Sequence, residues 1–581
     1  MKLRITIVFV FSSLLSLAQV GIGTTNPEGA LDITSSNMGL VIPRVPNFEV
    51  VTDGAGNPAV NGTMVYDILR QSNCYKIAGN WVCTGFDESG NLVTEEQIPI
   101  NTTDCTYFKA SNTGTNDGIG SFTVMSDDGN YLAVTTVEED SNATGINGDG
   151  SNNSASRSGA VYVFVRIGGI WSQQAYIKAS NAEANDFFGT HISLSNDGSR
   201  LAVGAYNERS NATGVGGDQT DNSINGAGAV YVFSRSGTTW AQEAYIKASN
   251  TGEDYDRFGT YVSLSDDGSR LAVGALGEDS NATGVGGDQT NNAATDSGAV
   301  YMFSRSGTTW SQEAYIKASN TEANDNFGLT LSLSGDATRL VVGTVLEDSN
   351  ATGINGDETS NTSSSSGAAY VFLRSGTTWT QEAYIKASNT DANDYFGKSI
   401  SLDADGNTLA IGANQEDSDA TGIGGDQTNN TGYTSGAVYL FTRTGTTWSQ
   451  QAYIKSGSSD NFDQFGNSLA LSSDGDKLMV GAPTEDGYDS GLGGDPTNND
   501  LQDAGAAFLF ERSGSTWSQT EYFKACNPDV GDNFGQAVAL NDSATLVGIS
   551  AHREDSNATG VNGNMLSNST SNSGAVYVFD N

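Results

Sequence analysis

The sequence has little of what enzyme active sites commonly use. Its 581 residues include 2 His, 4 Cys and 8 Pro. The two histidines, His191 and His552, lie far apart and match no metal-binding spacing such as H-E-x-x-H. No G-x-S-x-G nucleophile turn and no phosphate-binding loop occurs in a suitable context. We therefore predict a protein that is not an enzyme and has no catalytic residues.

Basic residues are also scarce, since 27 Lys and Arg stand against 68 Asp and Glu. The formal net charge of −41 at pH 7 opposes contact with phosphate backbones, which excludes nucleic acid as a partner. The same charge favours solubility outside the cell, attraction of cations, or contact with a basic partner.

Long apolar runs are absent after the first residues. Lys2 and Arg4 precede an apolar run over residues 5–17, and small residues follow it. This pattern is typical of a secretory signal peptide, so we predict that residues 1–18 are removed by cleavage near Ala18. The run is too short to cross a bilayer, and no later stretch is more apolar. We expect a secreted or cell-surface protein without a transmembrane segment.

The four cysteines are too few for a disulfide scaffold in a chain of this length. Cys74 and Cys83 are close enough in sequence to bridge a small hairpin, which we predict. Cys105 and Cys526 fall in different repeats of the pattern described next. We expect both of them to be free.

What the sequence has in abundance is a repeat, clearest over residues 245–303. A Tyr-Ile-Lys segment is followed by Phe-Gly, then by Leu-Ala-Val-Gly-Ala, then by Gly-Ala-Val-Tyr. The spacing between copies is 69 residues, except for 70 between the third and fourth. A constant period of this kind indicates a repeat architecture. The aromatic residue that opens the Tyr-Ile-Lys segment stands at Tyr107, Tyr176, Tyr245, Tyr315, Tyr384, Tyr453 and Tyr522.

Each copy contains four candidate β-strands and no segment with helical periodicity. In the third copy an Asp-Gly turn joins residues 258–265 to residues 270–275, which is a strong hairpin signal. A long polar loop then leads to a third strand at 298–303 and a fourth at 310–319. Four antiparallel strands repeated seven times predict an all-β protein, a seven-bladed β-propeller over residues 101–581. Small residues such as Gly259 and Gly274 suit a crowded axis.

The order of strands at the two ends of the repeat predicts how the ring closes. The last copy stops after its third strand, at 574–579, and the missing fourth strand stands before the first copy, at 104–111. Pairing this N-terminal strand with the last blade removes the open edges of the ring. We therefore predict that the N-terminal strand completes blade seven.

These motifs resemble the FG-GAP repeat of integrin α-subunit propellers and of related secreted bacterial proteins. The resemblance covers about 480 residues and all seven copies. It rests on Phe-Gly followed by Val-Gly-Ala, with Phe-Gly weakened to Ile119-Gly120 in the first copy. Propellers of that kind are chiefly platforms for adhesion and ligand binding, so the resemblance implies such a role. Phe-Gly recurs at Phe188, Phe258, Phe327, Phe396, Phe465 and Phe534.

Residues 19–100 do not follow the repeat. Short apolar segments separated by Gly and Pro predict a small β-rich N-terminal module. Its opening V-G-I-G-T-T-x-P, followed by L-D-I, resembles a leader module of secreted bacterial surface proteins. We expect a structural role for it, with oligomerisation as one form of that role.

Calcium is the one cofactor that the sequence suggests. The polar loop between the second and third strands carries Glu-Asp and, later, a second Asp, and such oxygens in a Gly-rich loop suit Ca²⁺. The alternative is that Asp side chains close local turns. The Asp-Gly hairpins are poorer candidates, because Arg270 and its equivalents replace the last carboxylate, although Asp403 and Asp405 come near the motif. The predicted Ca²⁺ ligands are Asp140, Asp149, Asp279, Asp288, Asp348, Asp357, Asp417, Asp426, Asp486 and Asp495.

A further Asp stands two residues before every Phe-Gly, for example Asp256, and its presence in all copies indicates a structural cap. We expect these residues and the polar loops to share one strongly negative face. Our leading hypothesis is an exported binding or adhesion protein that presents this face to an extracellular protein or glycan. A structural component of the cell envelope is the alternative, and an enzyme that degrades extracellular polymers is a distant one.

Overall fold

The computed structural model describes residues 105–252 and 254–581 in full and, before them, only the backbone of short strands. The chain divides into two compact units, Met1–Asn101 and Thr102–Asn581. The predicted signal peptide lies outside the described residues. None of the residues described here belongs to a helix that could cross a bilayer.

The first unit contains two small sheets. β1 (Val20–Ile22) pairs in parallel with β2 (Leu31–Ile33). The pairing of β5 (Ser72–Ile77) with β6 (Asn80–Phe86) sets Cys74 opposite Cys83 on the backbone, while the side chains of these two cysteines lie outside the described part. The second sheet consists of β3 (Arg44–Val45), β4 (Met64–Asp67), β5 (Ser72–Ile77), β6 (Asn80–Phe86) and β7 (Leu92–Thr94).

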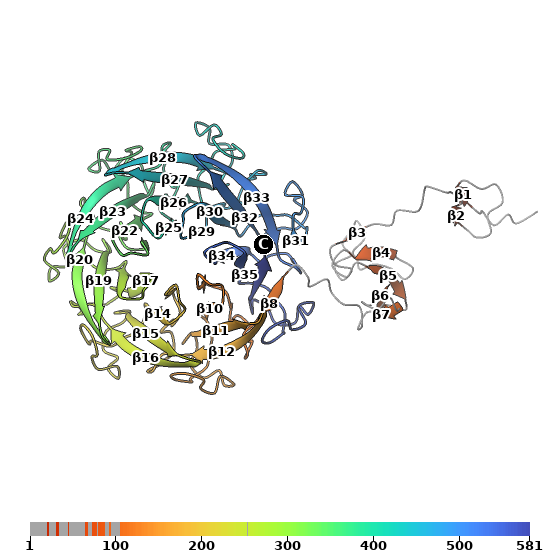
Figure 1. Cartoon of the computed structure of the whole chain (residues 1–581), viewed down its shortest axis with the longest axis horizontal. Helices are drawn as coiled ribbons and strands as arrows, with labels where there is room; N and C mark the ends of the chain where they lie inside the picture. Colours follow the sequence, from red (N-terminus) through yellow and green to blue (C-terminus); the bar gives the residue numbers. More distant parts are fainter. Residues whose placement is uncertain are drawn as a thin grey trace, which may run out of the picture. The chain divides into compact units, whose positions relative to one another are not determined.

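The second unit is a ring of seven antiparallel sheets, which confirms the predicted seven-bladed β-propeller (Figure 1). In each blade the first strand is innermost, and the fourth is outermost except in blade six, where the short strand β31 (Gly491–Leu492) pairs with the outer side of the fourth. Blade one consists of β9 (Thr123–Met125), β10 (Tyr131–Thr136), β11 (Ala160–Ile167) and β12 (Ile170–Ile177). Blade two consists of β13 (Ile192–Leu194), β14 (Arg200–Ala205), β15 (Ala229–Ser236) and β16 (Thr239–Ile246). Blade three consists of β17 (Phe258–Leu264), β18 (Arg270–Ala275), β19 (Ala299–Ser306) and β20 (Thr309–Ile316).

The remaining blades keep this order, and blade six gains a short fifth strand. Blade four consists of β21 (Thr330–Leu333), β22 (Arg339–Thr344), β23 (Ala368–Ser375) and β24 (Thr378–Ile385). Blade five consists of β25 (Ser399–Leu402), β26 (Thr408–Ala413), β27 (Ala437–Thr444) and β28 (Thr447–Ile454). Blade six consists of β29 (Ser468–Leu471), β30 (Lys477–Ala482), β31 (Gly491–Leu492), β32 (Ala506–Ser513) and β33 (Thr516–Lys524).

Blade seven is completed by the N-terminal strand, as the strand order predicted. It consists of β34 (Phe534–Leu540), β35 (Leu546–Ala551), β36 (Ala575–Asp580) and β8 (Thr106–Phe108). Tyr107 of β8 stands opposite Tyr577 of β36 in an antiparallel register. The ring is therefore closed by hydrogen bonds between the two ends of this unit.

A disulfide between Cys105 and Cys526 fastens the same junction. The prediction that both cysteines are free is wrong. Cys105 directly precedes β8, and Cys526 follows β33 at the exit of blade six, so closing the ring brings together residues that are 421 positions apart. The repeat register separates them in sequence, whereas the closed ring makes them neighbours.

Adjacent blades pack through aromatic side chains and paired glycines. Phe258 lies edge-on to Tyr301, with 5.4 Å between ring centroids, and both pack against apolar residues of blade two. A Cβ at Gly274 would stand 2.1 Å from the carbonyl oxygen of Gly328 in the next blade. The sequence led us to expect small residues because the ring axis is crowded. The structure shows that they are required where neighbouring blades meet.

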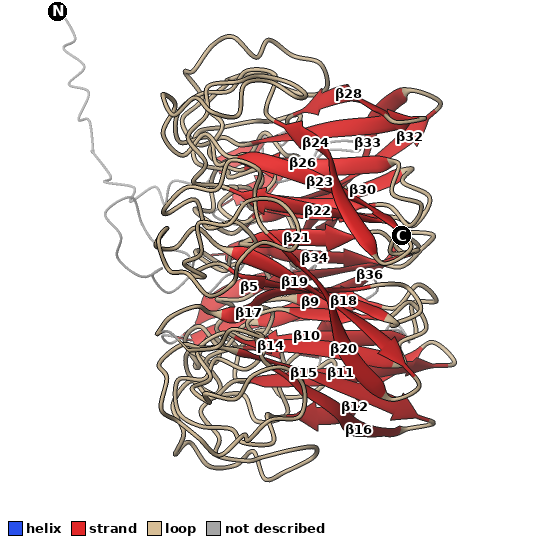
Figure 2. Cartoon of the chain, turned by 90° about the vertical axis from the view of Figure 1, so that its left-hand side faces the viewer, coloured by secondary structure: helices blue, strands red, loops and turns tan. Residues whose placement is uncertain are grey.

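The two faces of the ring differ in the length of their connections. Figure 2 shows the ring edge-on, with long loops on its left side and short turns on its right. The loops between second and third strands share one face with the links between blades, because the two sets exchange backbone hydrogen bonds, for example Asn185 N–H to the Ser156 oxygen at 2.7 Å. We call this side the loop face and the opposite side the hairpin face.

Candidate functional site

A buried ion pair lies under the loop face of every blade. The Glu of each Glu-Asp pair, which follows the second strand, turns inward and meets the Lys of the Tyr-Ile-Lys segment. Nitrogen–oxygen distances run from 2.5 to 2.9 Å, and all these side chains are at most 3% exposed. The pairs are Glu139–Lys178, Glu208–Lys247, Glu278–Lys317, Glu347–Lys386, Glu416–Lys455, Glu485–Lys524 and Glu554–Lys109.

Uncharged side chains form hydrogen bonds to the charged pair, as blade four illustrates. In blade four the Tyr384 hydroxyl donates to Glu347 at 2.7 Å, and Lys386 donates to the Ser366 hydroxyl at 2.8 Å. The amide of Asn320, from the link with blade three, donates to Glu347 and accepts from the Tyr370 hydroxyl. Two buried charges with satisfied partners are stable together, but either one alone would be costly. This cluster therefore holds the fold together.

Sequence reasoning missed this role, because it treated Glu and Asp of each pair alike as loop acids. One signal was available. Blade two keeps Glu208 although Arg209 replaces the following Asp, and each copy keeps the Lys of its Tyr-Ile-Lys or equivalent segment. One acidic and one basic residue that are both kept in every copy indicate that the two side chains form an ion pair.

Blade six departs from this cluster in a coordinated way. The position of Asn320 is occupied by Ser458, and that of its partner Tyr370 is occupied by Phe508. The acceptor and its donor have thus been lost together. This joint change within one chain supports the pairing seen in the other blades.

The Asp that precedes each Phe-Gly by two residues is buried and caps a turn, which agrees with the structural role expected from the sequence. The carboxylate of Asp394 accepts the backbone N–H of Asp391 at 3.0 Å. Burial raises the pKa of Asp394 to about 8, and the nearby Glu416 adds to the effect. Burial likewise raises the pKa of Asp325 to about 8 and that of Asp186 to about 7.

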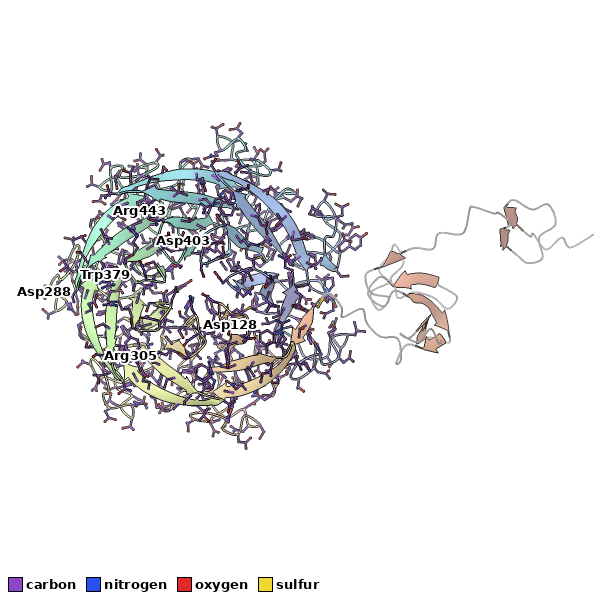
Figure 3. All side chains as sticks on the ribbon, in the orientation of Figure 1. Asp128, Asp288, Arg305, Trp379, Asp403 and Arg443 are labelled. Atoms are coloured by element: carbon purple, nitrogen blue, oxygen red, sulfur yellow. A yellow bond between two sulfur atoms is a disulfide. The ribbon has the colours of Figure 1, made fainter. Side chains whose placement is uncertain are left out.

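The predicted calcium ligands close turns in the loops. The first Asp accepts a backbone N–H seventeen residues later, as Asp279 does from Asp296 at 2.7 Å. The second accepts the N–H two residues later, as Asp288 does from Thr290 at 2.9 Å. Figure 3 shows Asp288 at the outer rim of the ring. The same pairings recur at Asp140, Asp348, Asp417 and Asp486 for the first position and at Asp149, Asp357, Asp426 and Asp495 for the second.

Because these carboxylates already accept backbone hydrogen bonds, we asked whether they are also placed to bind a metal ion. Among residues 105–252 and 254–581, no group of three or more His, Cys, Asp or Glu side chains is placed to hold an ion. At the hairpin, Asp403 and Asp405 both accept the Asn407 N–H, as in an ordinary turn. The loop carboxylates do not converge in this arrangement, and calcium binding by them stays a prediction.

Three exposed aromatic side chains lie on the loop face, which also exposes a few aliphatic side chains such as Val530. Tyr255, Tyr433 and Phe462 are 51%, 59% and 60% exposed. The Phe462 N–H donates to the Tyr433 carbonyl oxygen at 2.8 Å, so these two residues adjoin at the junction of blades five and six.

Tyr255 and Phe462 also have backbone φ values of 73°. The left-handed region costs a residue with a Cβ about 1–2 kcal/mol, although Asn tolerates it better. Four other copies place asparagine at this position, with φ between 65° and 72°, and the last copy places Gly531 there. Stability therefore does not explain the aromatic residues. The asparagines are Asn116, Asn185, Asn324 and Asn393.

The ring axis holds a cavity of about 520 Å³, lined mainly by the inner strands of the blades. Its wall repeats only in part: a leucine at the end of the inner strand recurs at Leu194, Leu333, Leu402, Leu471 and Leu540, whereas other lining positions differ between blades. Phe122, His191 and Tyr261 form one side in blades one to three, and hydroxyl residues together with aliphatic ones form the other. The side chains leave an open space at the centre of the ring in Figure 3.

The two histidines are unsuited to proton transfer near neutral pH. Burial lowers the pKa of His191 to about 3 and that of His552 to about 4. The His191 ring stacks on Tyr261, with 3.5 Å between centroids, and its Nδ1 accepts the Val262 N–H at 3.4 Å. The structural role expected for His191 agrees with these contacts.

Comparison with known families finds two matches. The FG-GAP repeat family matches four segments, residues 171–233, 240–303, 310–372 and 379–441. Each segment runs from the outer strand of one blade to the third strand of the next. A family described as a phage tail like trimerisation region matches residues 21–94. No protein of curated function matches the chain.

Solved structures with a similar fold are distant. A protein assigned as a 6-phosphogluconolactonase from Bacteroides uniformis is 12% identical, with a TM-score of 0.41 over 77% of this chain and 93% of that one. The periplasmic gluconolactonase of Pseudomonas aeruginosa is 14% identical, with a TM-score of 0.39 over 78% and 93%. The Swd1 β-propeller domain of Myceliophteria thermophila is 8% identical, with a TM-score of 0.42 over 82% and 99%. Similarities this distant carry no information about activity.

Proposed function

Because the chain belongs to the FG-GAP repeat β-propellers, we propose that it is an exported, non-catalytic binding protein. Its loop face binds an extracellular protein or glycan that carries basic groups, and adhesion is the role this suits. The observation that carries the proposal is the aromatic pair Tyr433 and Phe462, exposed on an acidic face.

The chemistry of the loop face supports this ligand class. Aromatic rings supply apolar contact area and attract cations through their faces. Exposed carboxylates such as Asp288 and Asp357 add attraction for amino groups, which salt weakens. Phe462 keeps a costly backbone conformation where asparagine would be easier. A contribution to binding accounts for that cost better than a contribution to folding does.

The test is binding of the full chain to two cationic probes, polylysine and chitosan hexaose, with acetylated chitohexaose as the uncharged control. Biolayer interferometry at low salt should detect at least one cationic probe and no comparable signal for the control. Phe462→Asn and Tyr433→Ser should each weaken binding about tenfold. Phe462→Asn should also raise thermal stability slightly, because it restores the residue found in other blades.

Asp542→Asn is the matched control, since it removes one exposed carboxylate from a turn of the hairpin face. Equal binding by the Phe462→Asn, Tyr433→Ser and wild-type proteins would contradict the proposal. So would an equal loss in the Asp542→Asn protein.

A structural role remains the second candidate, favoured by the trimerisation-region match over residues 21–94. It predicts that the full chain is a trimer and that deleting residues 19–100 yields a monomer by light scattering. Trimerisation would also strengthen binding at the loop face, because three linked sites act together on one surface. A monomeric full chain would exclude this candidate.

A further inference from the structure

The lysine that lines the axial cavity differs from the buried lysines of the repeat. Lys398 follows Phe396-Gly397 and directly precedes β25. Among the described residues, no carboxylate forms an ion pair with its ammonium. Burial lowers the pKa of Lys398, and no acidic neighbour opposes this effect. For Lys386 burial acts in the same direction, but the Glu347 carboxylate opposes it.

The repeat does not require a lysine at position 398. The equivalent positions in the other blades are uncharged, and the other lining cation, His191, is neutral at pH 7. Lys398 is therefore the one lysine or arginine among the described residues that line the cavity, and the carboxyl groups of Asp127 and Asp266 also line it. The equivalent residues are Ser121, Thr190, Thr260, Leu329, Asn467 and Gln536.

The hydroxyl side of the wall offers hydrogen-bond acceptors. Thr330 donates to the carbonyl oxygen of Gly397 at 2.6 Å, and Ser399 donates to that of Gly466 at 2.7 Å. Ser468 makes the equivalent bond to Gly535 at 2.9 Å. Because each hydroxyl proton is already used, the lone pairs that remain favour a ligand with donors of its own, such as hydroxyl groups.

The opposite side of the wall is aromatic. Phe122, His191 and Tyr261 form a connected set, with 4.7 Å between the first two ring centroids. Since Nδ1 of His191 accepts a backbone N–H, the proton of the neutral ring lies on Nε2, where it is a donor. Aromatic rings beside polar groups suit the apolar face of a sugar ring.

We propose that the axial cavity is a second binding site, one that takes a small acidic saccharide with its carboxylate on Lys398. Its volume of about 520 Å³ falls within the range of roughly 300–1,000 Å³ typical of small-molecule sites. The carboxylate pairs with the ammonium, the sugar hydroxyls donate to the Thr330, Ser399 and Ser468 side, and one face of the ring packs on the aromatic side. This site is independent of the loop face and does not rest on the function proposed for it.

The test is isothermal titration calorimetry of the full chain with galacturonate, galactose and inorganic phosphate. Galacturonate should bind at least tenfold more tightly than galactose, because galactose lacks the carboxylate. It should also bind more tightly than phosphate, which lacks the sugar ring. Lys398→Met should weaken galacturonate binding at least tenfold and bring it close to that of galactose. Thermal unfolding of the Lys398→Met protein should match the wild type.

Several outcomes would overturn the proposal. These are no binding of galacturonate, equal affinity for galactose and galacturonate, or unchanged binding in the Lys398→Met protein. Phosphate binding as tight as that of galacturonate would reduce the site to a simple anion site and contradict the saccharide class. If Lys398→Met does not fold, Lys398→Gln and the galactose comparison on the wild type still decide the matter. Asp288→Asn, which removes an exposed carboxylate at the outer rim of the ring, should bind galacturonate as the wild type does.

Discussion

Two sets of residues surround the propeller axis, and they obey opposite rules. The buried Glu–Lys pairs under the loop face are the same in all seven blades, including the one that β8 completes with Lys109. Several positions that line the axial cavity change from blade to blade, such as the one held by His191, Tyr261 and Thr330 in successive blades. Repetition therefore marks what folding requires of each blade, and departure from it marks positions that folding leaves free. Lys386 and Lys398, twelve positions apart in blades four and five, are one example of each.

The largest expected effect comes from breaking a repeated pair. Glu347→Gln leaves Lys386 charged and buried without its partner, which should cost about 3–5 kcal/mol of unfolding free energy. Because the clusters are alike, Glu278→Gln and Glu416→Gln should cost similar amounts. Guanidinium unfolding measures all three. Losses of unfolding free energy below 1 kcal/mol would show that folding does not require the pairs, and would contradict the contrast between repeated and unrepeated residues.

The disulfide between Cys105 and Cys526 also joins the two ends of the ring, and no other blade has an equivalent of it among the described residues. Replacing Cys105 and Cys526 together by Ala should lower stability by about 2–4 kcal/mol, because the disulfide restricts the unfolded chain. Thermal unfolding with and without reductant provides the control, since reductant should affect the wild type and spare the double variant. Equal stability of both proteins would mean that β8 alone closes the ring.

Blade six predicts how the cluster tolerates change. Asn320→Ser in blade four should cost about 1–3 kcal/mol, because it leaves the buried Tyr370 hydroxyl without its acceptor. Adding Tyr370→Phe reproduces the combination of Ser458 and Phe508 and should recover part of that loss. A double-mutant cycle measures the coupling. Strictly additive losses would contradict the pairing.

The buried aspartates give the ring a pH dependence. Their folded-state pKa values, about 8 for Asp394, Asp325 and Asp463, exceed the ordinary value of 3.8. The folded state thus holds protons that the unfolded state has released, so stability should fall as pH rises from about 4 to about 8. Asp394→Asn should make the fall in melting temperature less steep than in the wild type. An identical slope would show that Asp394 ionises normally.

Calcium should have the smallest effect. The carboxylates of Asp279 and Asp288 already accept backbone N–H groups, so we expect no change in melting temperature between EGTA and millimolar Ca²⁺. If Ca²⁺ bound only the folded state, a free concentration of a hundred times its dissociation constant would raise the free energy of unfolding by about 2.7 kcal/mol. A rise of that size, reduced by Asp279→Asn together with Asp288→Asn, would confirm the calcium site predicted from the sequence.

The sequence predicted the ring and its closure, because both follow from the period and from the strand order at its two ends. The pairing of Cys105 with Cys526 was missed, since it depends on how blades six and seven meet around the closed ring. The buried Glu–Lys pairs were missed because a Glu-Asp dipeptide in a polar loop looks exposed. Phe462 and Lys398 each differ from the repeat in one copy. The backbone φ value of Phe462 and the position of Lys398 in the cavity wall are known only from the structure.

The most direct test of the contrast between repeated and unrepeated residues is guanidinium unfolding of Lys386→Met and Lys398→Met beside the wild type. Both variants remove one ammonium and keep a side chain of similar length. Lys386→Met leaves Glu347 buried without its partner and should lower the free energy of unfolding by about 3–5 kcal/mol. Lys398→Met removes an unpaired charge and should leave stability unchanged or raise it. Equal losses in the two proteins would contradict the account, because Lys398 would then belong to the scaffold.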